Sequence, residues 1–207
     1  MSDFSIQARK LQEILISKGI DNQKVLEAFS KVPRHLFVPK EFEHKAYLDL
    51  SLPIGKGQTI SAPSTMAFML QNINIIQTDK VLEIGTGSGF QTALLTKLGK
   101  EIFSIERNLE LVKEVEKKLV AANCGVAHLR AGDGMLGWSE HAPYDAIIVS
   151  AGASEIPNAL IDQLKIGGRI VIPLKGKINL IIKSSHGVRI RELADCNFVP
   201  LLPGHTK

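Results

Sequence analysis

The amino-acid sequence predicts an α/β fold built on a doubly wound, mostly parallel β-sheet. Between residues 79 and 174, short apolar stretches alternate with stretches of helical character, and the first apolar stretch leads directly into a glycine-rich turn. Such alternation is typical of a parallel sheet that helices cover on both faces, with ligands at the carboxyl ends of the strands. We expect one domain over residues 1–207, in which residues 1–75 form helices and a loop and residues 76–207 form the sheet and C-terminal strands.

Two helices are expected in the N-terminal segment. Apolar residues recur at steps of three and four from Phe4 to Leu15, which places them on one face of a helix that Gly19 ends. Asp21 is suited to cap a second helix. Prolines at positions 33, 39, 53 and 63 interrupt the next stretch, so it is expected to be an ordered loop that leads to a helix over residues 67–72.

The alternating region supplies the strands and helices of the predicted sheet. Expected strands cover residues 81–84, 102–105, 126–129, 146–150 and 169–174, and expected helices cover residues 91–98, 109–122 and 158–164. The strands are short and apolar, as expected for strands buried on both faces of a sheet. Three closely spaced strands with tight turns follow at residues 179–183, 188–193 and 198–201, which predicts an antiparallel C-terminal edge.

Composition predicts a globular protein with free thiols. The chain has 207 residues, of which 44% are hydrophobic, and a net charge of +4. Basic residues are spread among acidic ones, so no nucleic-acid partner is expected. The two cysteines, Cys124 and Cys196, form no CxxC motif, which indicates a reducing compartment. Since no signal peptide and no run of about 18 apolar residues is present, we expect a cytoplasmic protein with no membrane partner. We also expect a monomer without a metal site.

The glycine-rich turn predicts a nucleotide-type site. Residues 81–89 read VLEIGTGSG, with Gly85, Gly87 and Gly89 at every second position. Glycines let the backbone turn sharply and approach a ligand closely. A dinucleotide loop has the spacing GxGxxG and a P-loop ends in Gly-Lys-Ser/Thr, and this sequence has neither. The loop of S-adenosylmethionine-dependent methyltransferases and a loop that binds no ligand remain as interpretations.

Two acidic residues further along the chain are candidate ligand contacts. Glu106 ends the next expected strand, 21 positions after Gly85. A carboxylate there can accept hydrogen bonds from both hydroxyls of a ribose, or it can cap the helix that begins near Asn108. Asp133 can accept a hydrogen bond from an adenine amino group, or it can form an Asp-Gly turn with Gly134.

A second distinctive segment lies ahead of the glycine loop. Residues 55–63, GKGQTISAP, place Gln58, Thr59 and Ser61 in a loop bounded by glycine and proline. Further motifs are VPRHLFVP at 32–39, LPIGKGQTISAP at 52–63, VLEIGTGSGFQT at 81–92, GDG at 132–134, APYDAIIV at 142–149, EIP at 155–157 and FVPL at 198–201. With these motifs, almost the whole chain resembles the protein-L-isoaspartate (D-aspartate) O-methyltransferase family, for which residues 57–63 are the most distinctive match.

The resemblance implies a Rossmann-like class I methyltransferase fold and a protein-repair reaction. A methyl group passes from S-adenosylmethionine to the free α-carboxylate of an L-isoaspartyl residue in a damaged protein or peptide. The ester collapses to a succinimide, and hydrolysis of the succinimide restores some normal aspartate. By the same match, Ser61 is the catalytic residue, and Ser61, Ala62, Pro63 and Ser64 contact the substrate. The implied cofactor-binding residues are Thr59, Ile60, Glu83, Gly85, Thr86, Gly87, Ser88, Gly89, Glu106, Asp133 and Gly134.

Physical chemistry agrees with a site that has no strong base. A carboxylate with a pKa of about 4 is already ionised at neutral pH, so no proton must be removed before attack. Catalysis is then mainly the positioning of two bound groups away from water. We therefore expect the Ser61 hydroxyl to orient the carboxylate rather than to act as a nucleophile. No Gly-x-Ser-x-Gly motif surrounds Ser61, which argues against a hydrolase.

Some positions depart from the family pattern or leave alternatives open. Ser64 stands where many relatives carry histidine or an aromatic residue, which affects how the substrate backbone is contacted. Arg34 and His35 are expected to pack rather than to catalyse. A methyltransferase for RNA or a small molecule is the alternative function, although the chain lacks the Asn/Asp-Pro-Pro-aromatic motif and the basic groove that RNA favours. A non-catalytic binding module is a third hypothesis.

Overall fold

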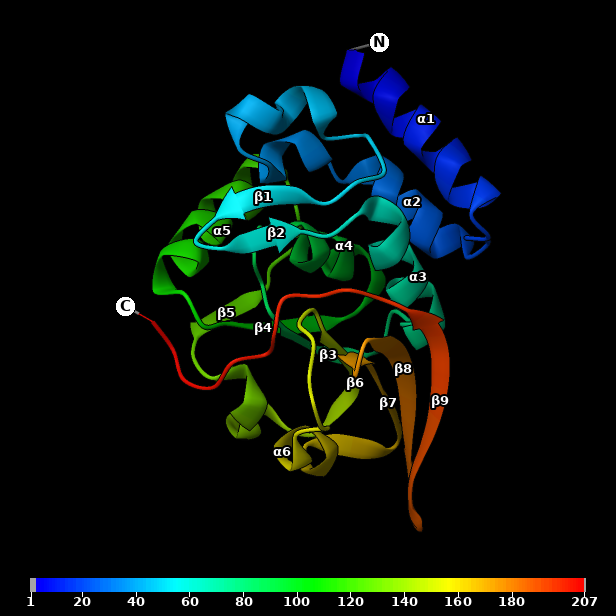
Figure 1. The fold of residues 1–207 in the computed structure, drawn as a ribbon, viewed down its shortest axis with the longest axis vertical. Helices are drawn as coiled ribbons and strands as arrows, with labels where there is room; N and C mark the ends of the chain where they lie inside the picture. The colour runs from blue at the N-terminus through cyan, green and yellow to red at the C-terminus, as the bar shows by residue number, and fades with distance from the viewer. Residues whose placement is uncertain (1–2, 207) are drawn as a thin grey trace.

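The computed structural model describes residues 3–206, which form a seven-stranded sheet between layers of helices (Figure 1). The strands are β3 (Lys80–Ile84), β4 (Glu101–Glu106), β5 (His128–Ala131), β6 (Tyr144–Val149), β7 (Leu164–Leu174), β8 (Lys177–Ser184) and β9 (Gly187–Asp195). They lie in the order β5-β4-β3-β6-β7-β8-β9. Neighbouring strands from β5 to β7 pair in parallel. The β7–β8 and β8–β9 pairs are antiparallel. The predicted α/β fold with an antiparallel C-terminal edge is confirmed.

The central strand β3 is buried on both faces because its alternate side chains enter two separate cores. Val81 lies in the core beneath α1 (Asp3–Ser17), α2 (Gln23–Lys31), α3 (Pro63–Ile73), α4 (Phe90–Leu98) and α5 (Leu109–Ala121). Leu82 and Ile84 lie in the opposite core, which α6 (Asn158–Asp162) covers through Leu160. All three β3 side chains are at most 2% exposed. This two-sided burial explains the continuous apolar pattern in the sequence.

The proline-interrupted segment is ordered, as expected, and contains short elements. It forms the 3₁₀ helices η1 (Arg34–Phe37) and η2 (Lys40–Lys45) and a hairpin of β1 (Leu52–Gly55) and β2 (Gln58–Ile60). The helix that follows starts at Pro63, earlier than expected, since proline is well suited to the first turn of a helix. The cap of α2 is Asn22 rather than Asp21, because the Asn22 side chain accepts hydrogen bonds from the backbone of Lys24 and Val25.

The prediction of a last strand at residues 198–201 is wrong. This segment makes only an isolated bridge between Gly152 and Pro200, and the chain then crosses the carboxyl end of the sheet toward β5 (Figure 1). Pro200 and Pro203 have no backbone N–H to donate to a strand ladder. The segment is instead fastened by main-chain bonds to Gly152 and, further on, by a 2.7 Å bond from Thr206 N to Arg107 O. We call residues 196–206 the C-terminal strap.

Two more 3₁₀ helices, η3 (Gly134–Leu136) and η4 (Ser139–His141), connect β5 to β6.

None of the helices formed by residues 3–206 combines the length and apolar character that crossing a bilayer requires.

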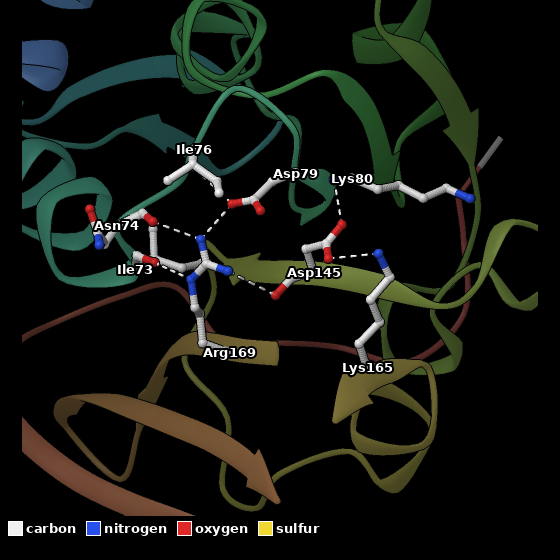
Figure 2. Close-up of polar contacts among 8 residues, drawn as sticks. All are labelled: Ile73, Asn74, Ile76, Asp79, Lys80, Asp145, Lys165 and Arg169. Atoms are coloured by element: carbon white, nitrogen blue, oxygen red, sulfur yellow. Dashed lines mark hydrogen bonds and ion pairs between the residues drawn. The ribbon is translucent and has the colours of Figure 1, made fainter. Parts of the chain in front are cut away.

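Arg169 on β7 fastens the amino-terminal end of the sheet (Figure 2). Its guanidinium donates to the carbonyl oxygens of Ile73 and Asn74 at 2.6 Å each and also contacts the Asp79 carboxylate. A further bond of 3.3 Å reaches the carbonyl of Asp145. One partly buried cation on β7 thereby links this strand to the end of α3 and to the starts of β3 and β6, at the end opposite to the glycine loop.

We predict that Arg169→Met lowers the free energy of unfolding by about 2–4 kcal/mol, because it leaves the Ile73 and Asn74 carbonyls and the buried Asp79 carboxylate without their partner. Urea denaturation followed by circular dichroism measures this change. Lys177→Met is the control, since Lys177 pairs with Glu192 on the exposed surface. Equal stability of the two variants would contradict the role given to Arg169.

Candidate active site

A cavity of about 690 Å³ lies at the carboxyl ends of the parallel strands, where ligands of open α/β sheets bind. Its walls come from the ends of β3 and β4, the turn after β6, the β1–β2 hairpin with the start of α3, and the C-terminal strap. Strands β3 and β6 are neighbours whose following connections run in opposite directions along the sheet. The cavity therefore sits at the topological switch point, and its volume suits a small-molecule ligand.

The glycine loop forms one wall. Gly85, Gly87 and Gly89 have φ values of 93°, 52° and 85°, in the left-handed region that favours glycine. Gly85, Thr86, Gly87 and Ser88 line the cavity. Gly89 is absent from the lining residues, and a Cβ there would lie 2.6 Å from a methyl group of Val115. The third glycine thus permits α4 to pack against α5, while the first two present main chain to a ligand.

Glu106 faces the cavity and fastens the glycine loop. One carboxylate oxygen accepts from Gly87 N at 2.9 Å, and the other accepts from Asn108 N at 3.0 Å. Asn108 in turn caps α5 with its side chain. Asn108 rather than Glu106 is therefore the cap of α5, so the helix-cap interpretation of Glu106 is wrong. Each Glu106 carboxylate oxygen retains a second lone pair that can accept from a ligand hydroxyl.

Glu83 lies beneath the glycine loop and is absent from the residues that line the cavity. Its carboxylate accepts hydrogen bonds from Thr92, Ser104 and Gln91 at 2.5, 2.6 and 3.0 Å. Burial raises the pKa of Glu83 to about 7, although these hydrogen bonds lower it. Ser104 also contacts the Thr86 hydroxyl at 2.6 Å. Glu83 is thus placed to support the loop from below.

Gln91 connects this buried network to the cavity. The Gln91 amide donates to Glu83 at 3.0 Å and to the Ser150 hydroxyl at 2.7 Å, and both Gln91 and Ser150 line the cavity. The sequence motif GFQT contained Gln91, but no spacing rule indicated that its side chain reaches Ser150 in the turn after β6.

Asp133 forms the expected Asp-Gly turn and also holds the C-terminal strap. Its carboxylate accepts from Met135 N at 2.8 Å and from Gly204 N at 2.7 Å. Asp133 is absent from the cavity lining, whereas Gly134 is part of it. A Cβ at Gly134 would lie 2.3 Å from a methyl group of Ile84, so glycine is required by the close approach of this turn to β3.

The loop expected to hold the substrate faces the glycine loop across the cavity. Thr59, Ile60, Ser61, Ala62 and Ser64 line it, whereas Pro63 is buried at the start of α3. The cavity therefore brings together two segments that the sequence separates by more than twenty residues.

Three side chains that sequence analysis did not assign to the site hold this loop. Ser51 donates from its hydroxyl to Ile60 O at 3.0 Å, and Asp49 accepts from Ser64 N at 2.8 Å. Arg34 donates to Ser61 O at 3.0 Å. The signal for Arg34 was its place in the motif VPRHLFVP, but only the folded chain shows what it contacts.

The fold and this cavity define a class I, S-adenosylmethionine-dependent methyltransferase. The residues present fit the nucleoside: main chain of the glycine loop is accessible, the Glu106 carboxylate lies beside it, and the cavity volume is sufficient. Within residues 3–206, no group of three or more His, Cys, Asp or Glu side chains could hold a metal ion.

Comparisons with known proteins identify the family. Residues 6–206 match the family model described as Protein-L-isoaspartate(D-aspartate) O-methyltransferase (PCMT). A protein-L-isoaspartate O-methyltransferase of Flavobacterium psychrophilum is 49% identical over 197 residues, covering 93% of this chain and 92% of the relative. One from Dictyoglomus thermophilum is 46% identical over 203 residues, covering 96% and 92%. The chain belongs to the protein-L-isoaspartate(D-aspartate) O-methyltransferase family.

A solved structure supports the same assignment. It comes from Plasmodium falciparum, is named as a protein-L-isoaspartate O-methyltransferase in complex with S-adenosyl-L-homocysteine, and matches with a TM-score of 0.83 at 25% identity. The match covers 98% of this chain and 99% of that chain. The methyl donor of this family is S-adenosylmethionine, as expected from the sequence.

We predict that Glu83 makes the free energy of unfolding fall as pH rises from 5 to 7. Its folded pKa of about 7 lies above the ordinary value of 4.5, so in this window the folded protein holds a proton that the unfolded chain has released. Glu83→Gln cannot titrate. The free energy of unfolding of the variant minus that of the parent should therefore increase from pH 5 to 7, as measured by urea denaturation.

Glu116→Gln, on the exposed surface of α5, controls for the loss of one carboxylate. A difference between Glu83→Gln and the parent that stays constant across the pH range would show that the pKa of Glu83 is not raised.

Proposed function

We propose that this protein repairs damaged proteins by methylating the free α-carboxylate of L-isoaspartyl residues. The observation that carries the proposal is that Ser61, in the loop Gln58 to Pro63, lines the same cavity as the glycine loop. Family membership supports the reaction, and the geometry supports a site that holds two ligands side by side. The methyl ester then closes to a succinimide without the enzyme, and hydrolysis returns part of the product to normal aspartate.

The residues of this site bind and orient rather than transfer protons. S-adenosylmethionine, when bound, supplies a methyl group that is already activated by its sulfonium centre. The isoaspartyl carboxylate is ionised at neutral pH, so it needs orientation and protection from water. We assign that orientation to the Ser61 hydroxyl, with Ala62 and Ser64 contributing to the substrate contacts. Pro63 is buried outside the cavity, so we assign to it the support of these neighbours.

We propose roles for the cofactor-binding residues in the same way. Gly85, Thr86, Gly87 and Ser88 present main chain to the methionine part, and Glu106 accepts from the ribose hydroxyls. The remaining proposed positions are Thr59, Ile60, Glu83, Gly89, Asp133 and Gly134. Of these, Glu83, Gly89 and Asp133 do not line the cavity, so we assign to them support of the residues that do.

The organisation around this site stays a prediction. We propose that residues 1–207 form one domain, that the chain acts as a cytoplasmic monomer, and that its partners are isoaspartyl proteins and peptides rather than nucleic acid.

The proposed function predicts selective methyl transfer. Labelled methyl from S-adenosylmethionine should enter a peptide that contains one L-isoaspartyl residue and should not enter the same peptide with normal aspartate. The label should be released by mild base, because a carboxyl methyl ester hydrolyses readily. Equal labelling of both peptides, or base-stable label, would contradict the proposal.

Ser61→Ala should lower kcat for the isoaspartyl peptide by about 10- to 100-fold, because the carboxylate loses the group that orients it. The Kd for S-adenosylhomocysteine, measured by calorimetry, should stay the same. Ser184→Ala, in the exposed β8–β9 hairpin, is the matched control and should leave both values unchanged. An unchanged kcat in Ser61→Ala would remove Ser61 from the role assigned to it.

A further inference from the structure

We propose that Arg34 is a positioning residue of the active site, which fixes the main chain of Ser61 relative to the helix that follows the glycine loop. The proposal rests on the function proposed above and deepens it. Sequence analysis expected Arg34 to pack without a part in the reaction.

The guanidinium of Arg34 links three segments that are distant in sequence. Its Nε donates to Ala46 O at 2.8 Å, and its Nη2 donates to Ser61 O at 3.0 Å. The central guanidinium carbon lies 4.9 Å from the centroid of the Phe90 ring. Phe90 is the first residue of α4, directly after Gly89. Arg34 therefore contacts both the substrate loop and the element that carries the methyl-donor loop.

The hydrogen bond from Arg34 matters more for the position of Ser61 than for the positions of the neighbouring residues Ile60 and Ser64. Ile60 is held by Ser51, and Ser64 is held by Asp49, so both ends of the segment have anchors of their own. The main chain of Ser61 itself is held by the hydrogen bond that the Arg34 side chain donates to Ser61 O. Loss of that bond would free the peptide unit whose side chain we assign to the substrate carboxylate.

Stability alone does not explain a cation at this place. Arg34 is 0% exposed, and no carboxylate oxygen within residues 3–206 lies within 4 Å of its nitrogens. Its Nη1 is buried without a hydrogen-bond partner in the part of the chain that the structure describes. Burying an incompletely paired charge costs free energy, and an apolar side chain of similar size is often better for stability.

The charge of the guanidinium persists at neutral pH. Burial lowers the pKa of Arg34 to about 9, and the charge of Asp49 opposes this shift. The planar guanidinium can therefore direct two N–H groups at two carbonyls at once. A lysine ammonium is a single point of charge and cannot reproduce this fork.

The reaction gives this geometry its importance. Since the carboxylate needs no general base, the site contributes mainly alignment, and a displacement of about 1 Å can cost about 100-fold in rate. A substitution of Arg34 should therefore lower kcat/KM for the peptide and leave the affinity for the nucleoside nearly unchanged.

The test compares Arg34→Met and Arg34→Lys with Arg169→Met and Arg169→Lys. Arg169 is the matched control because it also binds carbonyl oxygens of distant segments, at the opposite end of the sheet (Figure 2). For each folded variant, kcat and KM for the isoaspartyl peptide, the Kd for S-adenosylhomocysteine and the Tm are measured. Calorimetry also gives the Kd of the peptide for the S-adenosylhomocysteine complex, a readout that needs no turnover.

We expect Arg34→Met to lose at least about 10-fold in kcat/KM for the peptide, while the Kd for S-adenosylhomocysteine stays within about twofold. Arg34→Lys should retain more activity than Arg34→Met, because one of the two carbonyl bonds can be kept. The Arg169 variants should have a lower Tm but nearly the parent kcat/KM at temperatures where they are folded.

The proposal is overturned if folded Arg34→Met keeps the parent kcat/KM. It is also overturned if peptide and S-adenosylhomocysteine binding weaken together, or if neither Arg34 variant folds, since Arg34 then serves the fold as a whole. A parent enzyme that does not methylate the isoaspartyl peptide would instead contradict the proposed function, and that result is obtained before any variant is compared.

Discussion

The parallel pairing of β3 with β4 on one side and β6 on the other is the interaction on which the rest of the structure depends. It places Ile84 beside both Ile105 and Val149, so that the ends of three strands and the turns after them meet at one edge of the sheet. Gly85 N continues this pairing with a 2.8 Å bond to Ile105 O. The glycine loop therefore takes its position from the centre of the sheet.

Buried polar groups extend this rigid framework to the cavity. Beneath the glycine loop, the Glu83 carboxylate accepts hydrogen bonds from the side chains of Thr92, Ser104 and Gln91. Beside the loop, the Glu106 carboxylate accepts a hydrogen bond from Gly87 N. Across the cavity, the segment that carries Ser61 is held by residues from the N-terminal part of the chain. A methyltransferase whose substrate is already ionised needs mainly such preorganisation, which explains why polar side chains are used for holding the main chain.

The sequence alone predicted the sheet and both loops because their signals are local. Apolar runs, glycine spacing and prolines act within a few residues of the position that they determine. Residues 198–201 were misread because a short apolar run resembles a strand, whereas Pro200 and contacts with Gly152 decide the conformation of this segment. The roles of Arg34 and Asp49 could not be derived, since their partners lie 27 and 15 positions away in the chain. Glu83 was expected near the ligand, and only three-dimensional packing shows that it lies beneath the loop.

We propose that one cavity holds the methyl donor at the glycine loop and the isoaspartyl group at the Ser61 loop. The most direct measurement is a crystal structure of the protein with S-adenosylhomocysteine and an isoaspartyl peptide. We expect ribose hydroxyls within hydrogen-bond distance of Glu106 and the peptide α-carboxylate within hydrogen-bond distance of the Ser61 hydroxyl. A peptide bound outside this cavity, or a ribose that does not reach Glu106, would contradict it.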